Sequence, residues 1–335
     1  ITSCTNSTNF PTKNAIDSTH NGGLDAVVFK MDEALTSMIW GTYLGGNSDD
    51  AAYGLTLDID NNIIVAHTSS YSNPFYAIQS LDAGNSWDLI YSHNRGNDEY
   101  FMGICPLDKS SGLSFIYNDW KETKVYKYSS NDIYQISTIS GYCVYFYKFI
   151  SNSIVYVLAN SSDNVSPSTS KDTYFLYSED NGVTWETPIK ISEDEMPGNF
   201  FYLSENKMIV TLRELNNFYY ESNDGGMHWT KRTVDNIGKI RSIHFVNSNI
   251  GFLKTGTRFL WSAQNSGHVY KTLDGGSTWE QTTTEKVWGS KIYFIDENKG
   301  LLQDLDYGNG QILLESNDGG ETWEEILYPY PIVIP

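Results

Sequence analysis

Two stretches of this sequence, "SNDGGMHW" at residues 222–229 and "SNDGGETW" at residues 316–323, carry Ser, Asp, Gly and Trp at the same offsets. Three more stretches fit the same pattern: "SLDAGNSW" (80–87), "SEDNGVTW" (178–185) and "TLDGGSTW" (272–279). The pattern Ser/Thr-x-Asp-x-Gly-x-x-Trp therefore occurs five times. A catalytic motif normally occurs once, whereas a motif repeated at regular intervals indicates an architecture built from repeats.

The spacing of the anchoring aspartates extends the repeat to the whole chain. These are Asp82, Asp180, Asp224, Asp274 and Asp318. They are separated by 98, 44, 50 and 44 residues, so the first interval is about twice the others. It predicts a degenerate copy near its middle, which we assign to Asp132 in "YSSNDIYQIS". A second degenerate copy is expected at Asp32 in "FKMDEALTSMIW", 50 residues before the first clear one.

Alternating apolar runs flank each aspartate. "FYAIQS" and "TYFLYS" stand before two of them, and "WDLIYS" follows one. Such alternation predicts strands, and the Asp-x-Gly between them predicts a turn, with the Trp packed between sheets. Two further strands precede each hairpin, for example "KIYFID" and "KGLLQDLD". Each repeat is thus a four-stranded antiparallel sheet, and the chain is predicted to be an all-β, seven-bladed β-propeller.

The repeats divide a single domain, residues 1–335, into blades. We expect blades at approximately 1–45, 46–95, 96–140, 141–191, 192–236, 237–283 and 284–330. Residues 331–335, at the end of "YPYPIVIP", are expected to form the strand that closes the ring and so protects its sheet edges. Because the first residues resemble the middle of a blade, we also expect upstream sequence and flanking domains of a longer chain.

The five copies resemble Asp-box (BNR) repeats, which occur in the sialidase and sortilin propellers and in photosystem-assembly propellers. "NGGLDAVVFKMD" and "TYLGGNSDDAAYGLTLDIDNNIIVA" resemble a different propeller repeat, found in secreted bacterial proteins. The two resemblances imply a propeller located outside the cell or on the cell surface, but they name no activity, since one fold serves many functions. The residues expected to build the structural turns are Asp82, Trp87, Asp180, Trp185, Asp224, Trp229, Asp274, Trp279, Asp318 and Trp323.

The composition excludes some partners. The net charge is −19, from 22 basic and 41 acidic residues, which disfavours nucleic acid and anionic membrane surfaces. No apolar run reaches the roughly 18 residues of a membrane span, so no membrane insertion is expected. Cys105 and Cys143 fall on predicted inner strands of neighbouring blades, where either a disulfide or two buried thiols would fit. No metal-ligand spacing of histidines or phosphate-binding glycine loop occurs, and no cofactor is expected.

In a propeller, the connections between second and third strands share one face with the connections between blades. We call this the loop face; the Asp-x-Gly turns lie opposite it. Trp120, Trp261 and Trp288 map to the loop face, where exposed aromatic side chains suit contact with a sugar or a peptide. Capping of blade ends is the alternative role for these three residues.

Acidic residues also map to the loop face. The pairs are Asp49–Asp50 and Asp98–Glu99, and the run is Glu193, Asp194 and Glu195. The first four could supply paired carboxylates for glycoside hydrolysis, and the run could bind a cation. Solvated loop charges are the simpler interpretation of both.

The sequence favours a binding protein over an enzyme. Sialidases use three arginines around a carboxylate and carry an Arg-Ile-Pro motif; this chain has five arginines, no such motif and no arginine before Arg95. We therefore predict a non-catalytic secreted or cell-surface propeller that binds a protein or glycan partner through its loop face. A glycan-active hydrolase using Asp49, Asp50, Asp98 or Glu99 is one alternative. A structural module of a larger surface protein or filament is the other.

Overall fold

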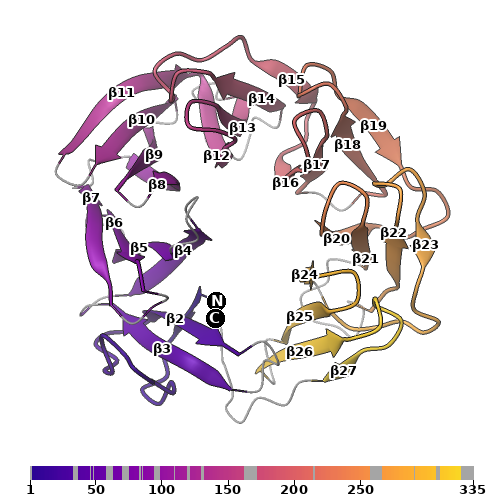
Figure 1. The fold of residues 1–335 in the computed structure, drawn as a ribbon, viewed down its shortest axis with the longest axis horizontal. Coiled ribbons are helices and arrows are strands. Elements are labelled where there is room, and N and C mark those ends of the chain that lie inside the picture. Colours follow the sequence, from indigo (N-terminus) through magenta and orange to yellow (C-terminus); the bar gives the residue numbers. More distant parts are fainter. Residues whose placement is uncertain are drawn as a thin grey trace. The chain divides into compact units, whose positions relative to one another are not determined.

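The structure is a computed structural model. It describes residues 2–32, 37–45, 47, 49–57, 63–69, 75–82, 84, 86–93, 99–108, 110–118, 121–129, 132–161, 172–213, 216–256, 266–289, 291–306 and 310–325. Every regular element in these residues is a β-strand, and the strands form seven antiparallel sheets (Figure 1). The all-β prediction is therefore confirmed. Within the described part of the chain, no helix is long and apolar enough to cross a membrane.

The described residues fall into two compact units, one up to Pro188 and one from Ile189 onward. The first unit begins with the sheet β1 (Thr2–Thr5), β2 (Asp25–Met31) and β3 (Met38–Leu44). The second sheet is β4 (Asp50–Leu57), β5 (Ile63–Ser69), β6 (Phe75–Ser80) and β7 (Asp88–His93). The third is β8 (Glu99–Asp108), β9 (Ser111–Asn118), β10 (Glu122–Ser129) and β11 (Asp132–Ser140). The strands β12 (Tyr142–Phe149), β13 (Val155–Ser161) and β14 (Thr173–Ser178) follow.

The second unit opens with β15 (Ile189–Ser192) and contains three complete sheets. The fifth sheet of the chain is β16 (Pro197–Tyr202), β17 (Met208–Leu212), β18 (Phe218–Ser222) and β19 (Thr230–Thr233). The sixth is β20 (Ile240–Phe245), β21 (Gly251–Thr255), β22 (Val269–Thr272) and β23 (Glu280–Gln281). The seventh is β24 (Lys291–Phe294), β25 (Gly300–Asp306), β26 (Gly310–Ser316) and β27 (Glu324–Glu325). Each sheet follows chain order from its first strand to its last.

Two of the predictions about organisation stay predictions. Residues 331–335, expected to close the ring, lie outside the described residues, and the first sheet has three described strands. The described residues form two compact units, and the assignment of residues 1–335 to a single domain also stays a prediction.

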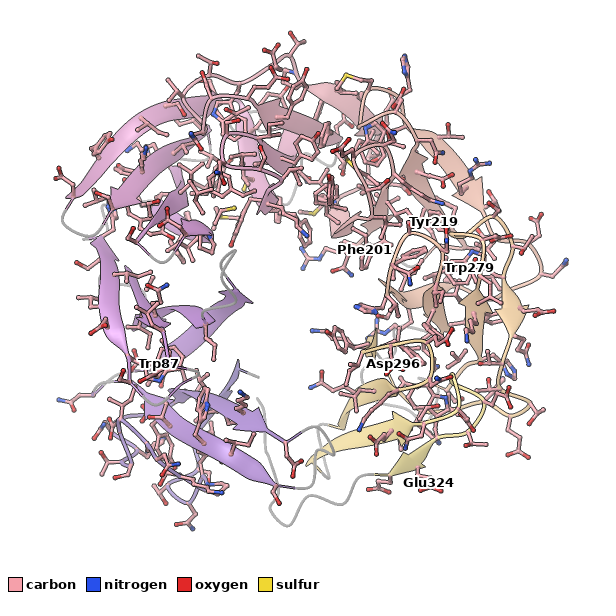
Figure 2. All side chains as sticks on the ribbon, in the orientation of Figure 1. Trp87, Phe201, Tyr219, Trp279, Asp296 and Glu324 are labelled. Carbon is pink, nitrogen blue, oxygen red and sulfur yellow. The ribbon has the colours of Figure 1, made fainter. Side chains whose placement is uncertain are left out.

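The hydrophobic core lies between consecutive sheets within each unit. In the second unit, Tyr219 on β18 packs with Phe245 on β20 and with the partly buried Trp279, and Figure 2 shows Tyr219 and Trp279 in the same region of the side-chain packing. Phe252 on β21 stacks on Phe294 on β24, with ring centroids 3.4 Å apart and planes 3° apart. These contacts join the fifth sheet to the sixth and the sixth to the seventh. These contacts are made by the apolar faces of the strands, as the alternating sequence pattern predicts.

The five Ser/Thr-x-Asp-x-Gly-x-x-Trp segments form one kind of turn, which we call the Asp turn. At Asp274, Oδ1 accepts hydrogen bonds from Thr272 Oγ1 (2.8 Å) and from the Thr278 backbone N–H (2.9 Å), and Oδ2 accepts one from Thr278 Oγ1 (2.7 Å). Gly276, at φ +93°, donates its N–H to Thr272 Oγ1 (2.8 Å). The bonds to Oδ1 and from the glycine N–H recur in the other four turns. Oδ2 accepts from a hydroxyl in three of them, whereas in the Asp224 turn it lies 2.6 Å from His228 Nδ1. These carboxylates are thus engaged in building the turn.

A hydroxyl of the preceding sheet reaches into three of these turns and donates to a glycine carbonyl. The pairs are Ser137 Oγ with Gly182 O (2.5 Å), Tyr219 Oη with Gly276 O (2.7 Å) and Thr282 Oγ1 with Gly320 O (2.8 Å). Each Asp turn of this group therefore fastens its own sheet to the one before it, in addition to closing its own hairpin.

The question left open for the cysteines is resolved. Cys105 and Cys143 are buried and free. Cys105 belongs to the core between the third sheet and β12–β14. Burial raises the pKa of both thiols to about 12, so both are protonated at neutral pH and behave as small apolar side chains.

Candidate functional site

Of the three tryptophans predicted to contact a ligand, one is described. Trp120 and Trp261 lie outside the described residues. Trp288 lies in the connection between β23 and β24, and 43% of its surface is exposed. A connection between consecutive sheets belongs to the loop face, so Trp288 remains a candidate contact residue.

One member of each acidic pair is buried. Asp49 is exposed, and Asp98 lies outside the described residues. Asp50 and Glu99, in contrast, are only 1% and 7% exposed, because they are the first residues of β4 and β8 and are covered by the packing of the sheets. The interpretation of Asp50 and Glu99 as solvated loop acids is therefore wrong.

Glu99 is also held in a local ion-pair network. Its Oε1 lies 3.2 Å from Lys124 Nζ, and its Oε2 lies 3.2 Å from His93 Nε2. A buried carboxylate placed between a lysine and a histidine helps to hold these side chains in position. The geometry therefore gives no support to its use as a hydrolytic acid.

The run Glu193, Asp194 and Glu195 lies between β15 and β16. Glu193 pairs with Lys190 (2.9 Å), while Glu195 Oε1 accepts a hydrogen bond from Asn216 Nδ2 (3.2 Å). Within the described part of the chain, no group of three or more His, Cys, Asp or Glu side chains could hold a metal ion. Glu193 and Glu195 thus have separate partners, and the geometry does not support a cation site made of this run.

A small recess in the second unit brings together residues that the sequence did not connect. It has a volume of about 200 Å³ and lies between the fifth and sixth sheets. Its lining residues are Gly198, Asn199, Thr211, Leu212, Arg213, Asn216, Phe218, Ile240, Arg241, Ser242 and Ile243. They come from the start of β16, the β17–β18 connection and the start of β20. This is the loop-face end of the two sheets, since the Asp turn of the fifth sheet follows the opposite end of β18.

Two β-bulges shape the recess. The pairing register shifts at Gly198 in β16 and at Arg241 in β20. Corresponding bulges occur in the first strands of earlier sheets, at Tyr53, Met102 and Tyr145, so the bulge is a feature of the repeat. A bulge redirects a side chain out of the regular strand pattern. In the sixth sheet the redirected residue is an arginine.

Gly198 keeps the recess open. A Cβ at this position would lie 2.5 Å from the carbonyl oxygen of Leu212, a contact with rigid backbone. Opposite it, the Ile240 N–H donates to Asn216 O (2.8 Å), which fixes the β17–β18 connection against β20. The backbone that presents Arg213 and Arg241 is therefore firmly positioned.

The recess is basic in an acidic protein. Among the described residues, two arginines and two asparagines line it and no carboxylate does. Arg213 is exposed, Arg241 is partly buried, and no carboxylate of the described residues pairs with Arg213. Arg232, by comparison, pairs with Glu221 (2.6 Å). Two arginines that converge on one cavity suit a planar anion such as a carboxylate.

A broader groove of about 740 Å³ adjoins the recess. It is lined by Lys190, Ile191, Ser192, Glu193, Asp194, Glu195, Tyr220 and Lys231. Phe218 and Asn216 separate the two hollows: Lys231 Nζ lies 3.4 Å from the Phe218 ring centroid, and Asn216 donates to Glu195. Burial raises the pKa of Glu195, and the charge of Lys231 and the hydrogen bond from Asn216 oppose that rise. Together the two hollows offer anion, cation and aromatic contacts.

The recess has no catalytic arrangement. Ser242 carries a hydroxyl that could act as a nucleophile, but its Oγ accepts a hydrogen bond from the Ile292 N–H (3.2 Å), and none of the described lining residues is a histidine or a carboxylate. A serine without a base within reach is not activated. The described lining residues can bind and orient a ligand.

Sequence reasoning missed this site. The arginines were weighed only against a sialidase clamp, and Arg213 and Arg241 lie 28 residues apart in no shared motif. One signal was present: few arginines occur in this acidic chain, and both precede or follow predicted strands on the loop face. That signal alone does not show that the two side chains share a cavity.

No protein-family model matches the chain. No curated protein matches it by sequence. Solved structures do match it. YCF48 from Cyanidioschyzon merolae is 12% identical, with 86% of this chain and 87% of that one covered and a TM-score of 0.56. A structure of YCF48 bound to D1 peptide is 13% identical, with coverages of 84% and 85% and a TM-score of 0.55.

A further match is a Bacteroides fragilis protein with a provisional 6-phosphogluconolactonase name. It is 11% identical, with 92% of this chain and 91% of that one covered and a TM-score of 0.59. At such identities the likeness concerns the fold alone. It confirms the predicted seven-bladed β-propeller fold, which this chain shares with proteins of different functions.

Proposed function

We propose that this chain is a non-catalytic binding propeller that holds a protein or glycan partner on the loop face of its second unit. The recess lined by Arg213 and Arg241 receives an anionic group of that partner, with a carboxylate as the best fit. The neighbouring groove, with Tyr220 and Lys231, contacts the adjoining part of the same partner. The proposal includes a location outside the cell or at its surface.

One observation carries this proposal. Two arginines of a chain with net charge −19 line one cavity, and one of them stands on a β-bulge. A protein of similar fold, YCF48, has been solved with a D1 peptide bound, so propellers of this kind can bind a peptide. The support for the location is the resemblance of the N-terminal segment to a repeat of secreted proteins, together with the acidic composition.

The test is a binding measurement with defined probes. Peptides with acidic side chains, uronic-acid oligosaccharides and neutral counterparts of both are applied to the immobilised protein. We expect the acidic probes of one class to bind and the neutral ones to bind at least tenfold more weakly. Arg213→Gln and Arg241→Gln should each weaken binding about tenfold to a hundredfold, since a charge-assisted pair contributes about 1.5–3 kcal/mol.

Lys286→Gln is the matched control. Lys286 is an exposed cation of the same unit that does not line the recess, so this variant makes the same change in net charge. Its affinity should stay within about twofold of the unaltered protein. Equal affinity for acidic and neutral probes, or unchanged affinity in both arginine variants, would contradict the proposal. Release of reducing ends would favour a hydrolase, and no binding by any probe would favour a structural module.

A further inference from the structure

Two buried carboxylates approach the same point in the first unit. Asp25, the first residue of β2, is fully buried, and Asp50, the first residue of β4, is 1% exposed. A Cβ built on Gly45 would lie 2.7 Å from Asp25 Oδ1 and 2.9 Å from Asp50 Oδ2. The two side chains therefore face one small volume beside Gly45, which stays open only because this residue has no side chain.

Only one of the two oxygens of the Asp25 carboxylate has a hydrogen-bond partner among the described residues. Its Oδ2 accepts a hydrogen bond from the Asn21 backbone N–H (2.8 Å). Its Oδ1 is buried and has no hydrogen-bond partner among the described residues, and no lysine, arginine or histidine described in the structure pairs with it. A buried carboxylate without a counter-charge is strongly unfavourable, and a second carboxylate facing it adds repulsion.

The surrounding loop is built to bring these groups together. The pairing of β2 with β3 sets Ala26 opposite Leu44, so the next residues outward, Asp25 and Gly45, are neighbours. Asp49 Oδ1 accepts a hydrogen bond from the Leu24 N–H (2.9 Å), and the Asp50 N–H donates to Leu24 O (2.6 Å). The connection from β3 to β4 is thus tied to the loop that precedes β2.

Gly23 makes this tie possible. A Cβ there would lie 2.1 Å from Asp49 Oδ1, so only glycine allows Asp49 to approach the loop. Asn21 is fixed as well, because its side-chain amide donates to Asp17 Oδ2 (2.8 Å) while its backbone holds Asp25. The Asp25 carboxylate is thus held by the Asn21 N–H, and the backbone at Asp50 is held by Leu24.

We infer that Asp25 and Asp50 bind a hard divalent cation, with calcium as the best fit, and that this cation joins β2 of the first sheet to β4 of the second. Hard cations take oxygen ligands, and calcium accepts carboxylates together with backbone carbonyls and waters. Two acidic side chains supply the charge, and backbone and water oxygens complete the shell. This is a different set from the Glu193–Glu195 run, and it is independent of the proposed binding site in the second unit.

Tyr43 lies close enough to Asp25 to be affected by its charge. Burial raises the pKa of Tyr43, and the charges of Asp25 and Asp17 raise it further, while a hydrogen bond from the Phe10 N–H opposes the rise. The nearby Tyr43 also offers a means of detection, since an excited tyrosine transfers energy to terbium bound within a short distance. Terbium is a standard substitute for calcium at oxygen sites.

The experiment compares the protein freed of metal by a chelator with the same protein after addition of calcium, magnesium or terbium. We expect about one cation per chain by equilibrium dialysis, tyrosine-sensitised terbium emission that calcium displaces, and a melting temperature raised by about 5 °C when calcium is at about a hundred times its Kd. Asp25→Asn should lose all three responses. Asp88→Asn, at an exposed acid of the same unit, should keep them.

Gly45→Ala is the second variant, because it keeps both charges and places a methyl group between them. Provided that circular dichroism shows the strand signature of the unaltered protein, this variant should also lose the cation. A full cation response in Asp25→Asn or Gly45→Ala would overturn the inference. So would an absence of any response in the unaltered protein combined with a rise in stability on acidification, which would show that the two carboxylates share a proton.

Discussion

The hydroxyl of Tyr219 donates a hydrogen bond to the carbonyl oxygen of Gly276, 2.7 Å away and 57 residues later in the chain. Tyr219 lies on β18 of the fifth sheet and is 1% exposed, whereas Gly276 lies in the Asp turn of the sixth sheet. The turn is therefore anchored to its neighbour as well as closed on itself. Burial raises the pKa of Tyr219 to about 12, so the group remains a neutral donor at ordinary pH.

Tyr219→Phe tests this link. The substitution keeps the ring in the core but leaves the buried Gly276 carbonyl without its donor, which costs about 1–3 kcal/mol. We expect the melting temperature to fall by about 2–6 °C in differential scanning calorimetry. Tyr134→Phe, at a tyrosine that is 51% exposed, should change it by less than a degree. Equal effects of the two substitutions would show that the hydrogen bond to Gly276 does not stabilise the fold.

The Asp turns predict an acid-sensitive contribution to stability. Hydrogen bonds from the Thr278 side chain and backbone hold the pKa of Asp274 at about 2, below its ordinary value of 3.8. The unfolded chain therefore binds a proton more readily between about pH 4 and pH 2. Stability from this group is fully present above pH 4 and is lost as the pH falls through 2.

Asp274→Asn measures that contribution. The variant should be less stable than the unaltered protein at pH 7 by about 1 kcal/mol, a value discounted because the carboxylate is largely exposed to solvent. The difference should shrink towards pH 2. Thr278→Val, which removes the strongest donor, should raise the pKa of Asp274 in a carbon-13 NMR titration, and Thr278→Ser should leave it low. A stability difference that does not vary between pH 2 and pH 5 would rule out this account of the turn.

The fold could be predicted because its decisive contacts are local. In the Asp turn, the side-chain hydrogen bonds that close the hairpin join residues two to four positions apart, so the pattern of Ser or Thr, Asp, Gly and Trp specifies the local geometry. The strands next to the turns follow from the same alternation; "FYAIQS" and "TYFLYS", for example, coincide with β6 and β14.

The sites could not be predicted in the same way, because they depend on contacts between sheets. Arg241 reaches the recess through a bulge in the register of β20 with β21, and its meeting with Arg213 requires the fifth and sixth sheets to pack together. Asp50 looked like one of two adjacent loop acids, but β4 begins at that residue and buries it, leaving only Asp49 outside. The position at which β4 begins therefore decides that the Asp50 carboxylate is buried while that of Asp49 stays exposed.

Glu221 gives a last prediction, on how the second unit balances buried charge. This residue on β18 is 5% exposed; its Oε2 lies 2.6 Å from Arg232 Nε, and its Oε1 lies 3.3 Å from Lys207 Nζ. Lys207 also donates to Gly275 O (2.7 Å), so the carboxylate orders a lysine that reaches the turn of the sixth sheet. Glu221→Gln removes the charge that both cations share.

We expect Glu221→Gln to lower stability by about 2 kcal/mol, less than for a fully buried pair because the Arg232 side chain is 52% exposed. Lys207→Met should have the larger effect of the two single cation variants, since it also removes the donor to Gly275, while Arg232→Met should have the smaller one. Double-mutant cycles by calorimetry separate the coupling of Glu221 to Lys207 from its coupling to Arg232. If Lys207→Met and Arg232→Met were equally mild and additive with Glu221→Gln, the carboxylate would be acting through packing alone, and the proposed link to the sixth sheet would fail.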